Sequence, residues 1–239
     1  MRSAEDEFER QLDIFHSECD AAVRYFYAGY GLQVSILKTP AAAAGLNKAP
    51  AFWNATLDAL KASTLITLGR VFDPDQNNHS LTRLIAFSQS NLQIFGAAAL
   101  RHRMQESQWR AQDFYEPSPD DFRRLKRLIA SRRREYETLL RPWRHRLYAH
   151  RGVLDSTELE GVPPDLEAAR LQKLVSFLPR VHGLLWRLYY DGQRPVMRPA
   201  RYSVERMLDR PSSNRELWSL QEKLAHEASQ VLCSINRDA

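Results

Sequence analysis

Apolar residues recur every three or four positions along most of the chain, and the strict alternation of a half-buried strand is almost absent. In residues 51–73 this spacing places six residues on one side of a helix, namely Trp53, Leu57, Leu60, Thr64, Leu68 and Val71. Such a stripe is typical of an amphipathic helix that packs against a core. Because the pattern repeats along the chain and glycine is scarce, the sequence predicts an all-α protein.

The same pattern predicts where the helices begin and end. We expect helices at about residues 6–37, 51–72, 81–89, 92–109, 119–141, 143–150, 165–190 and 214–235. Glycines suggest one break at residues 29–31, and residues 39–50 are expected to form a loop. Ser80 and Ser118 are expected to cap the helices that begin at residues 81 and 119. Prolines predict kinks at Pro142 and Pro179. We expect two parts, a helical domain over residues 1–193 with an N-terminal extension helix, and a C-terminal helical extension over residues 194–239.

Charge is unevenly distributed along the chain. The formal net charge is +5, but residues 101–151 alone hold 14 Lys/Arg and 7 Asp/Glu, a local excess of 14 − 7 = +7. A concentrated basic segment indicates either a polyanion partner or a solvated helix face. The run Arg132–Arg134 has the same two interpretations, and Arg70 and Asp73 are expected to form an ion pair or a helix cap.

Composition narrows the class of protein. Only two cysteines are present, and no CxxC or HExxH spacing occurs. We therefore expect neither a structural metal nor a cofactor. No apolar run approaches the ~20 residues of a membrane span, and the charged N-terminus has no signal-peptide core. These features predict a cytoplasmic protein with no membrane partner.

The stretch RHRLYAHR, residues 144–151, carries the candidate chemistry. Histidine can carry a proton at neutral pH, and arginine can bind a phosphate in a bidentate manner. On a helix, Arg144 and His150 border the apolar stripe that ends at Leu147, about 60° to either side. If the stripe packs within one chain, both are rim residues. If it packs against a second copy, two Arg/His sets meet in a basic cleft.

The spacing alone is a weak signal, since Arg10 and His16 have the same gap and are assigned no chemistry. With its context, however, Arg144 to His150 resembles the motif of HEPN domains. In that motif an arginine, often followed by a polar residue, precedes a histidine by four to six intervening positions, and here there are five. LITLGRVFD, residues 65–73, followed by Ser80 and Leu81, is similar to the abortive-infection AbiU-like branch. The resemblance spans about residues 50–190. It implies a HEPN-like helical bundle with additional C-terminal helices.

The resemblance also implies a function, a metal-independent endoribonuclease acting as a toxin in abortive infection and antiviral defence. His150 would be the general acid or base, Arg144 would bind phosphate, and His145 would be an auxiliary polar group. Arg146 and Arg151 would contact the RNA substrate. A homodimer and an antitoxin protein are the implied partners. Two alternatives stay open, a non-catalytic HEPN module that binds nucleotide, RNA or protein, and a helical scaffold with a basic face.

Some HEPN toxins carry a tyrosine two positions after the motif histidine, which a partner nucleotidyltransferase adenylylates. Here Gly152 occupies that position. The sequence therefore argues against this form of neutralisation. On a straight helix His145 also falls on the face opposite His150.

Overall fold

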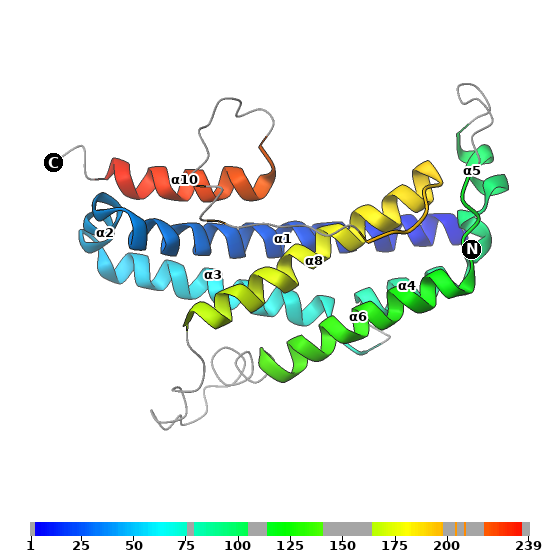
Figure 1. Ribbon diagram of the computed structural model, residues 1–239, viewed down its shortest axis with the longest axis horizontal. Helices are drawn as coiled ribbons and strands as arrows, with labels where there is room; N and C mark the ends of the chain where they lie inside the picture. Colours follow the sequence, from blue (N-terminus) through cyan, green and yellow to red (C-terminus); the bar gives the residue numbers. More distant parts are fainter. Residues whose placement is uncertain are drawn as a thin grey trace. The chain divides into compact units, whose positions relative to one another are not determined.

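The computed structural model describes residues 3–75, 79–104, 114–140, 164–197, 204, 208 and 218–235. All regular structure within these ranges is helical, which confirms the all-α prediction. The elements, shown in Figure 1, are α1 (Ala4–Lys38), α2 (Pro40–Asn47), α3 (Pro50–Val71), α4 (Leu81–Ser90), the 3₁₀ turn η1 (Leu92–Phe95), α5 (Ala97–Arg103), α6 (Pro119–Leu139), α8 (Pro164–Asp191) and α10 (Leu220–Ser234).

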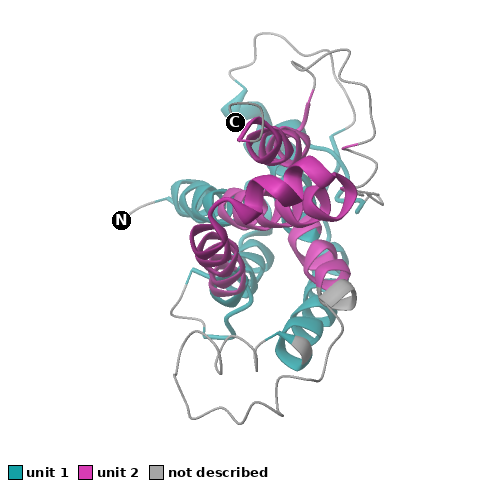
Figure 2. Cartoon of the chain, turned by 90° about the vertical axis from the view of Figure 1, so that its left-hand side faces the viewer, with its two compact units in different colours: residues 1–19, 68–142, 177–199 teal, residues 20–67, 143–176, 200–239 magenta. Residues whose placement is uncertain are grey.

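The chain divides into two compact units, coloured separately in Figure 2. Unit 1 comprises residues 1–19, 68–142 and 177–199, and unit 2 comprises residues 20–67, 143–176 and 200–239. Helices α1, α3 and α8 contribute residues to both units. The predicted boundary at residue 193 stays a prediction.

Unit 1 has an aromatic core. The ring of Phe8 on α1 lies 4.9 Å from that of Phe95 and 4.7 Å from that of Tyr189 on α8, centroid to centroid. Phe122 on α6 adds a ring 5.4 Å from Phe95. All four side chains are buried, and α4 packs against α6. Aromatic side chains bury large areas, so this cluster fixes the first half of α1, the second half of α8 and the start of α6 together.

Unit 2 differs from the sequence prediction at two places. Helix α1 continues through the expected break, because Gly31 faces a neighbouring helix rather than a turn. A Cβ atom at Gly31 would lie 2.9 Å from the Cα of Ala225 on α10. The glycine therefore permits close helix packing. Residues 39–50, expected as a loop, contain α2, whose first position is Pro40 and which continues with four alanines.

Helix ends follow local signals where the chain supplies them. Ser80 caps α4 by accepting a hydrogen bond from the backbone N–H of Arg83, as predicted. The expected single helix over residues 92–109 is instead η1 followed by α5, because Gly96 between them has an extended backbone. Helix α10 begins at Leu220 rather than at residue 214. Its capping box is formed by Ser219 and Glu222, since each accepts a backbone N–H of the other.

Candidate functional site

The five residues predicted to act on RNA lie outside the described residues. They are Arg144, His145, Arg146, His150 and Arg151. The kink expected at Pro142 also lies there. The last described residue before the motif is Leu140, just after α6, and the first described residue after it is Pro164, which begins α8. These two helices are therefore the described helices nearest to the motif along the sequence, one before it and one after it.

Helix α6 is firmly anchored in unit 1. Its predicted apolar stripe is confirmed over its described part, because the following side chains are buried: Phe122, Leu125, Ile129, Tyr136 and Leu140. The ring of Tyr136 stacks on that of Phe72, with centroids 5.7 Å apart. The backbone N–H of Ser118 donates to the carboxylate of Asp121 at 2.9 Å, which fixes the first turn. The motif thus follows a helix held along its whole length.

The run of three arginines on α6 splits into two kinds of side chain. Arg132 donates to Glu135 at 2.8 Å and Arg133 donates to Glu137 at 2.7 Å, and both arginines are partly buried. Arg134 is exposed. Since two of the three charges are neutralised within the helix, only Arg134 of this run is available to a polyanion.

Asp121 also receives a hydrogen bond from the hydroxyl of Tyr115, at 2.8 Å. Burial acts to raise the pKa of Asp121, but the hydrogen bonds from Ser118 and Tyr115 outweigh it and place that pKa below its ordinary value. Burial, together with the bond to this carboxylate, raises the pKa of Tyr115. Asp121 is therefore a charged structural acceptor at neutral pH.

Arg10 and His16, which have the same spacing as Arg144 and His150, both contact other side chains of unit 1. Arg10 donates to Glu7 at 3.0 and 2.7 Å, and its guanidinium lies 3.3 Å from Nε2 of His79. The bond from Arg10 lowers the pKa of Glu7 to about 2. The ring of His16 stacks on that of His182 at 4.5 Å between centroids. This agrees with assigning no chemistry to the earlier copy.

Arg70 has a partner on α1. Its guanidinium donates to both carboxylate oxygens of Glu18, with the shortest contact at 2.8 Å. Asp73 accepts the backbone N–H of Asp75 at 2.9 Å in the turn that follows α3. Arg70 therefore forms an ion pair with Glu18, a carboxylate that the sequence could not name, and its expected pairing with Asp73 stays a prediction.

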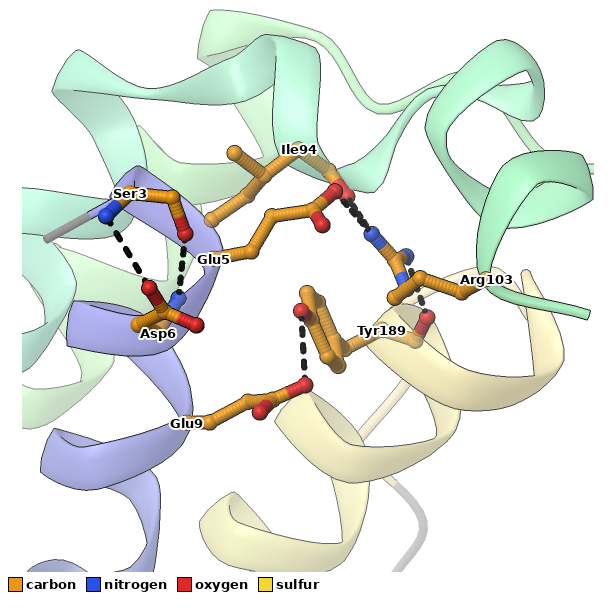
Figure 3. Close-up of polar contacts among 7 residues, drawn as sticks. All are labelled: Ser3, Glu5, Asp6, Glu9, Ile94, Arg103 and Tyr189. Carbon is orange, nitrogen blue, oxygen red and sulfur yellow. Dashed lines mark hydrogen bonds and ion pairs between the residues drawn. The ribbon is translucent and has the colours of Figure 1, made fainter.

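Unit 1 also contains a polar cluster around Arg103 and Tyr189 that the sequence analysis did not predict (Figure 3). Arg103 on α5 donates to Glu5 at 2.7 Å, to the carbonyl of Ile94 at 2.8 Å and to the carbonyl of Tyr189 at 2.8 Å. Its guanidinium carbon lies 3.8 Å from the centre of the Tyr189 ring. The Tyr189 hydroxyl donates to Glu9 at 3.0 Å, and burial raises the pKa of this tyrosine.

Three of the four hydrogen bonds in this cluster join residues more than 80 positions apart, so no sequence pattern could have found it. Arg103 is matched by a carboxylate, by two carbonyls and by an aromatic ring. The cluster therefore connects α1, η1, α5 and α8 and has the chemistry of a structural clasp rather than of a reactive site.

Unit 2 contains a small cavity of about 100 Å³ between α1, α3 and α8. Aromatic side chains form much of its wall, with Tyr25, Phe26 and Tyr30 from α1, and Lys61 of α3 contributes a cation. The rings of Phe26 and Tyr30 stack on each other at 5.4 Å. The cavity is large enough for several waters or one small ring.

Within the described ranges, no group of three or more His, Cys, Asp or Glu side chains has the arrangement of a metal site. None of the described helices combines the length and apolar character needed to cross a membrane.

Comparison with known proteins shows which family the chain, including the motif at residues 144–151, belongs to. No curated protein and no solved structure matches the chain significantly. The model of the HEPN AbiU2 family, described as AbiU2, matches residues 5–210. This range covers far more than half of the chain and includes all five predicted site residues. The chain therefore belongs to the HEPN AbiU2 family and is an all-α HEPN module of the abortive-infection type.

Proposed function

We propose that the chain is a metal-independent endoribonuclease of HEPN type that acts as a toxin in prokaryotic antiviral defence. The observation that carries the proposal is that the family match includes residues 144–151, where Arg144 and His150 have the HEPN spacing. The basic segment before them, with its local excess of +7, suits an RNA substrate.

The residue types are sufficient for cleavage without a metal, because RNA supplies its own nucleophile. The 2′-oxygen attacks the neighbouring phosphorus and the bond to the 5′-oxygen breaks. His150 accepts the 2′-hydroxyl proton or protonates the leaving 5′-oxygen. Arg144 holds the phosphate and stabilises its developing charge, with His145 as an auxiliary group and Arg146 and Arg151 as further substrate contacts. The products are a 2′,3′-cyclic phosphate and a 5′-hydroxyl.

The proposal places the site at a homodimer interface. Arg144 and His150 border an apolar stripe, and a charged residue beside a buried surface needs a partner. Packing of two such stripes about a two-fold axis would bring two Arg/His pairs to one cleft. Such a cleft would also be the surface that an antitoxin protein covers.

Cleavage of end-labelled RNA in the presence of chelator tests the chemistry. We expect the wild type to cleave, His150→Ala to lower the rate by about 10²–10⁴-fold, and Arg144→Ala to lower it by about 10²–10³-fold. His16→Ala is the matched control, because His16 shares the spacing and is exposed on α1. Unchanged cleavage by His150→Ala would refute the assignment, and loss of cleavage in chelator would refute metal independence.

A non-catalytic HEPN module is the second candidate. It is favoured by His145, which a straight helix places on the face opposite His150. Arginine and histidine also bind phosphate without cutting. Binding of RNA or nucleotide that Arg144→Ala abolishes, without any cleavage by the wild type, is the result that would select this candidate.

A further inference from the structure

The solvent-facing side of α6 carries a row of cations. Arg123, Arg127 and Arg134 are four and seven positions apart, which places them on one side of the helix, and all three are exposed. We call these three residues the basic face of α6. It extends about 16 Å along the helix axis. Arg123 pairs with Asp120. Neither Arg127 nor Arg134 has an ion-pair partner among the described residues.

Apart from Asp120, the acidic residues of α6 are already bound by side chains outside the basic face. Glu135 and Glu137 are partly buried and bind Arg132 and Arg133. Among the described exposed positions of α6, Asp120 is the only acidic one, and Ala130 and Ser131 beside the basic face are small and uncharged. Asp120 already binds Arg123, so a polyanion that lies along the basic face would meet Arg127 and Arg134 as the two cations without a competing carboxylate.

A groove adjoins α6 within unit 1. It has a volume of about 260 Å³, and its apolar wall includes Leu125, Leu128 and Leu184. Arg124 of α6 and Arg194, which follows α8, line the same groove, and both are exposed.

Among the described residues that line the groove, Asp121 is the only acidic one, and Ser118 and Tyr115 already donate hydrogen bonds to its carboxylate. The lining therefore carries two cations against one satisfied anion. An apolar wall with arginines beside it suits a nucleobase attached to phosphates.

We propose that the basic face of α6 and this groove bind the RNA strand outside the cleavage site. Phosphates lie on Arg127 and Arg134, and a base enters the groove between Arg124 and Arg194. The choice of RNA rests on the proposed function. It is supported by the order of the chain, since the described end of α6 at Leu140 is followed directly by the segment that holds the motif. A strand held by α6 would be long compared with the dinucleotide step that is cut.

Binding of a labelled 2′-O-methyl RNA oligonucleotide, measured over a series of salt concentrations, tests the surface. This probe has no 2′-hydroxyl and so is not cut by the proposed chemistry. We expect Arg127→Gln/Arg134→Gln to weaken binding about tenfold and to reduce the slope of log Kd against log salt by about 1.4. Arg124→Gln/Arg194→Gln should weaken binding similarly.

Arg24→Gln/Lys223→Gln is the matched control. It removes two exposed cations, Arg24 of α1 and Lys223 of α10, and both of these residues lie in unit 2. The control should stay within about twofold of the wild type. Melting curves from circular dichroism check that all variants fold. Wild-type affinity for the Arg127/Arg134 variant, or an equal loss for the control, would overturn the proposal. Binding of polyglutamate in place of RNA would overturn it in favour of a protein site.

Cleavage assays separate this proposal from the function on which it rests. If both hold, the Arg127/Arg134 variant cuts a dinucleotide at the wild-type rate but needs a higher concentration of long RNA. If the wild type binds the 2′-O-methyl probe through α6 and cuts nothing, the ribonuclease proposal fails and the binding surface stands. If it cuts RNA and the probe binds independently of α6, the surface proposal fails alone.

Discussion

Removing Arg103 should destabilise unit 1 more than removing any exposed arginine. Its side chain is only 13% exposed, and it binds Glu5, two carbonyl oxygens and the face of Tyr189 at once. Breaking a buried ion pair by deleting one partner costs about 3–5 kcal/mol. The side chain of Glu5 is 32% exposed, so water can partly solvate its carboxylate once Arg103 is gone. The loss of stability should therefore lie at the lower end of this range. We expect Arg103→Ala to lower the free energy of unfolding by about 3 kcal/mol.

Urea and thermal unfolding, followed by circular dichroism, measure this loss. For a chain of this length, about 3 kcal/mol corresponds to a fall in Tm of about 6–12 °C. Arg101→Ala is the control, because Arg101 lies on the same helix but is exposed. It should change the free energy of unfolding by less than about 0.5 kcal/mol. Arg103→Lys should fall between the two, since lysine keeps the charge but not the planar fork.

A double-mutant cycle isolates the ion pair. Glu5→Gln combined with Arg103→Ala should cost less than the sum of the single changes, by about 1 kcal/mol, because Glu5 and Arg103 are in direct contact at 2.7 Å. A loss of under about 1 kcal/mol for Arg103→Ala, or strict additivity in the cycle, would refute the reading of this cluster as a clasp.

Two further predictions rest on local geometry. Gly45→Ala should destabilise the protein by about 1–3 kcal/mol in urea titrations, because a Cβ atom would overlap the carbonyl oxygen of Leu232. Gly183→Ala should instead stabilise it by about 0.5–1 kcal/mol, since the nearest atom outside the local helix backbone is a guanidinium nitrogen of Arg187 at 4.0 Å. The pKa of Glu7, lowered from 4.5 to about 2, predicts a contribution to stability that is complete above pH 4.5 and is lost as the pH falls toward 2. Arg10→Gln should reduce that acid dependence in unfolding curves, with Gln11 still bound to Glu7 at 2.6 Å, and an unchanged curve would contradict the assignment.

Local signals explain what the sequence predicted correctly. Ser80, Ser118 and the stripe from Phe122 to Leu140 depend on residues within a few positions of one another, and caps and amphipathic periodicity act at that range. Their structures match the prediction because the local preference and the tertiary packing agree. The start of a helix and its buried face are therefore the features of this fold that the sequence predicts best.

The errors come from interactions at long range. Gly31 and Gly45 look like helix breakers, but each faces α10, about 190 residues later in the chain, and permits close packing there. Likewise, the bond between Glu9 and Tyr189 joins residues 180 positions apart. A single sequence carries no record of which helix will lie opposite a glycine, so such positions are read as turns.

The two Arg-x₅-His segments show why charge context matters more than spacing. Residues 4–20 contain seven Asp/Glu and one Arg, so the guanidinium of Arg10 finds an acidic partner, Glu7, within its own helix. Residues 101–151 carry twice as many basic as acidic side chains, and on α6 two exposed arginines have no acidic partner among the described residues. An arginine is available to a phosphate only where local carboxylates do not already bind it. The excess of basic residues in the sequence around residues 144–150, rather than their spacing, is therefore the physical reason to propose the chemistry there.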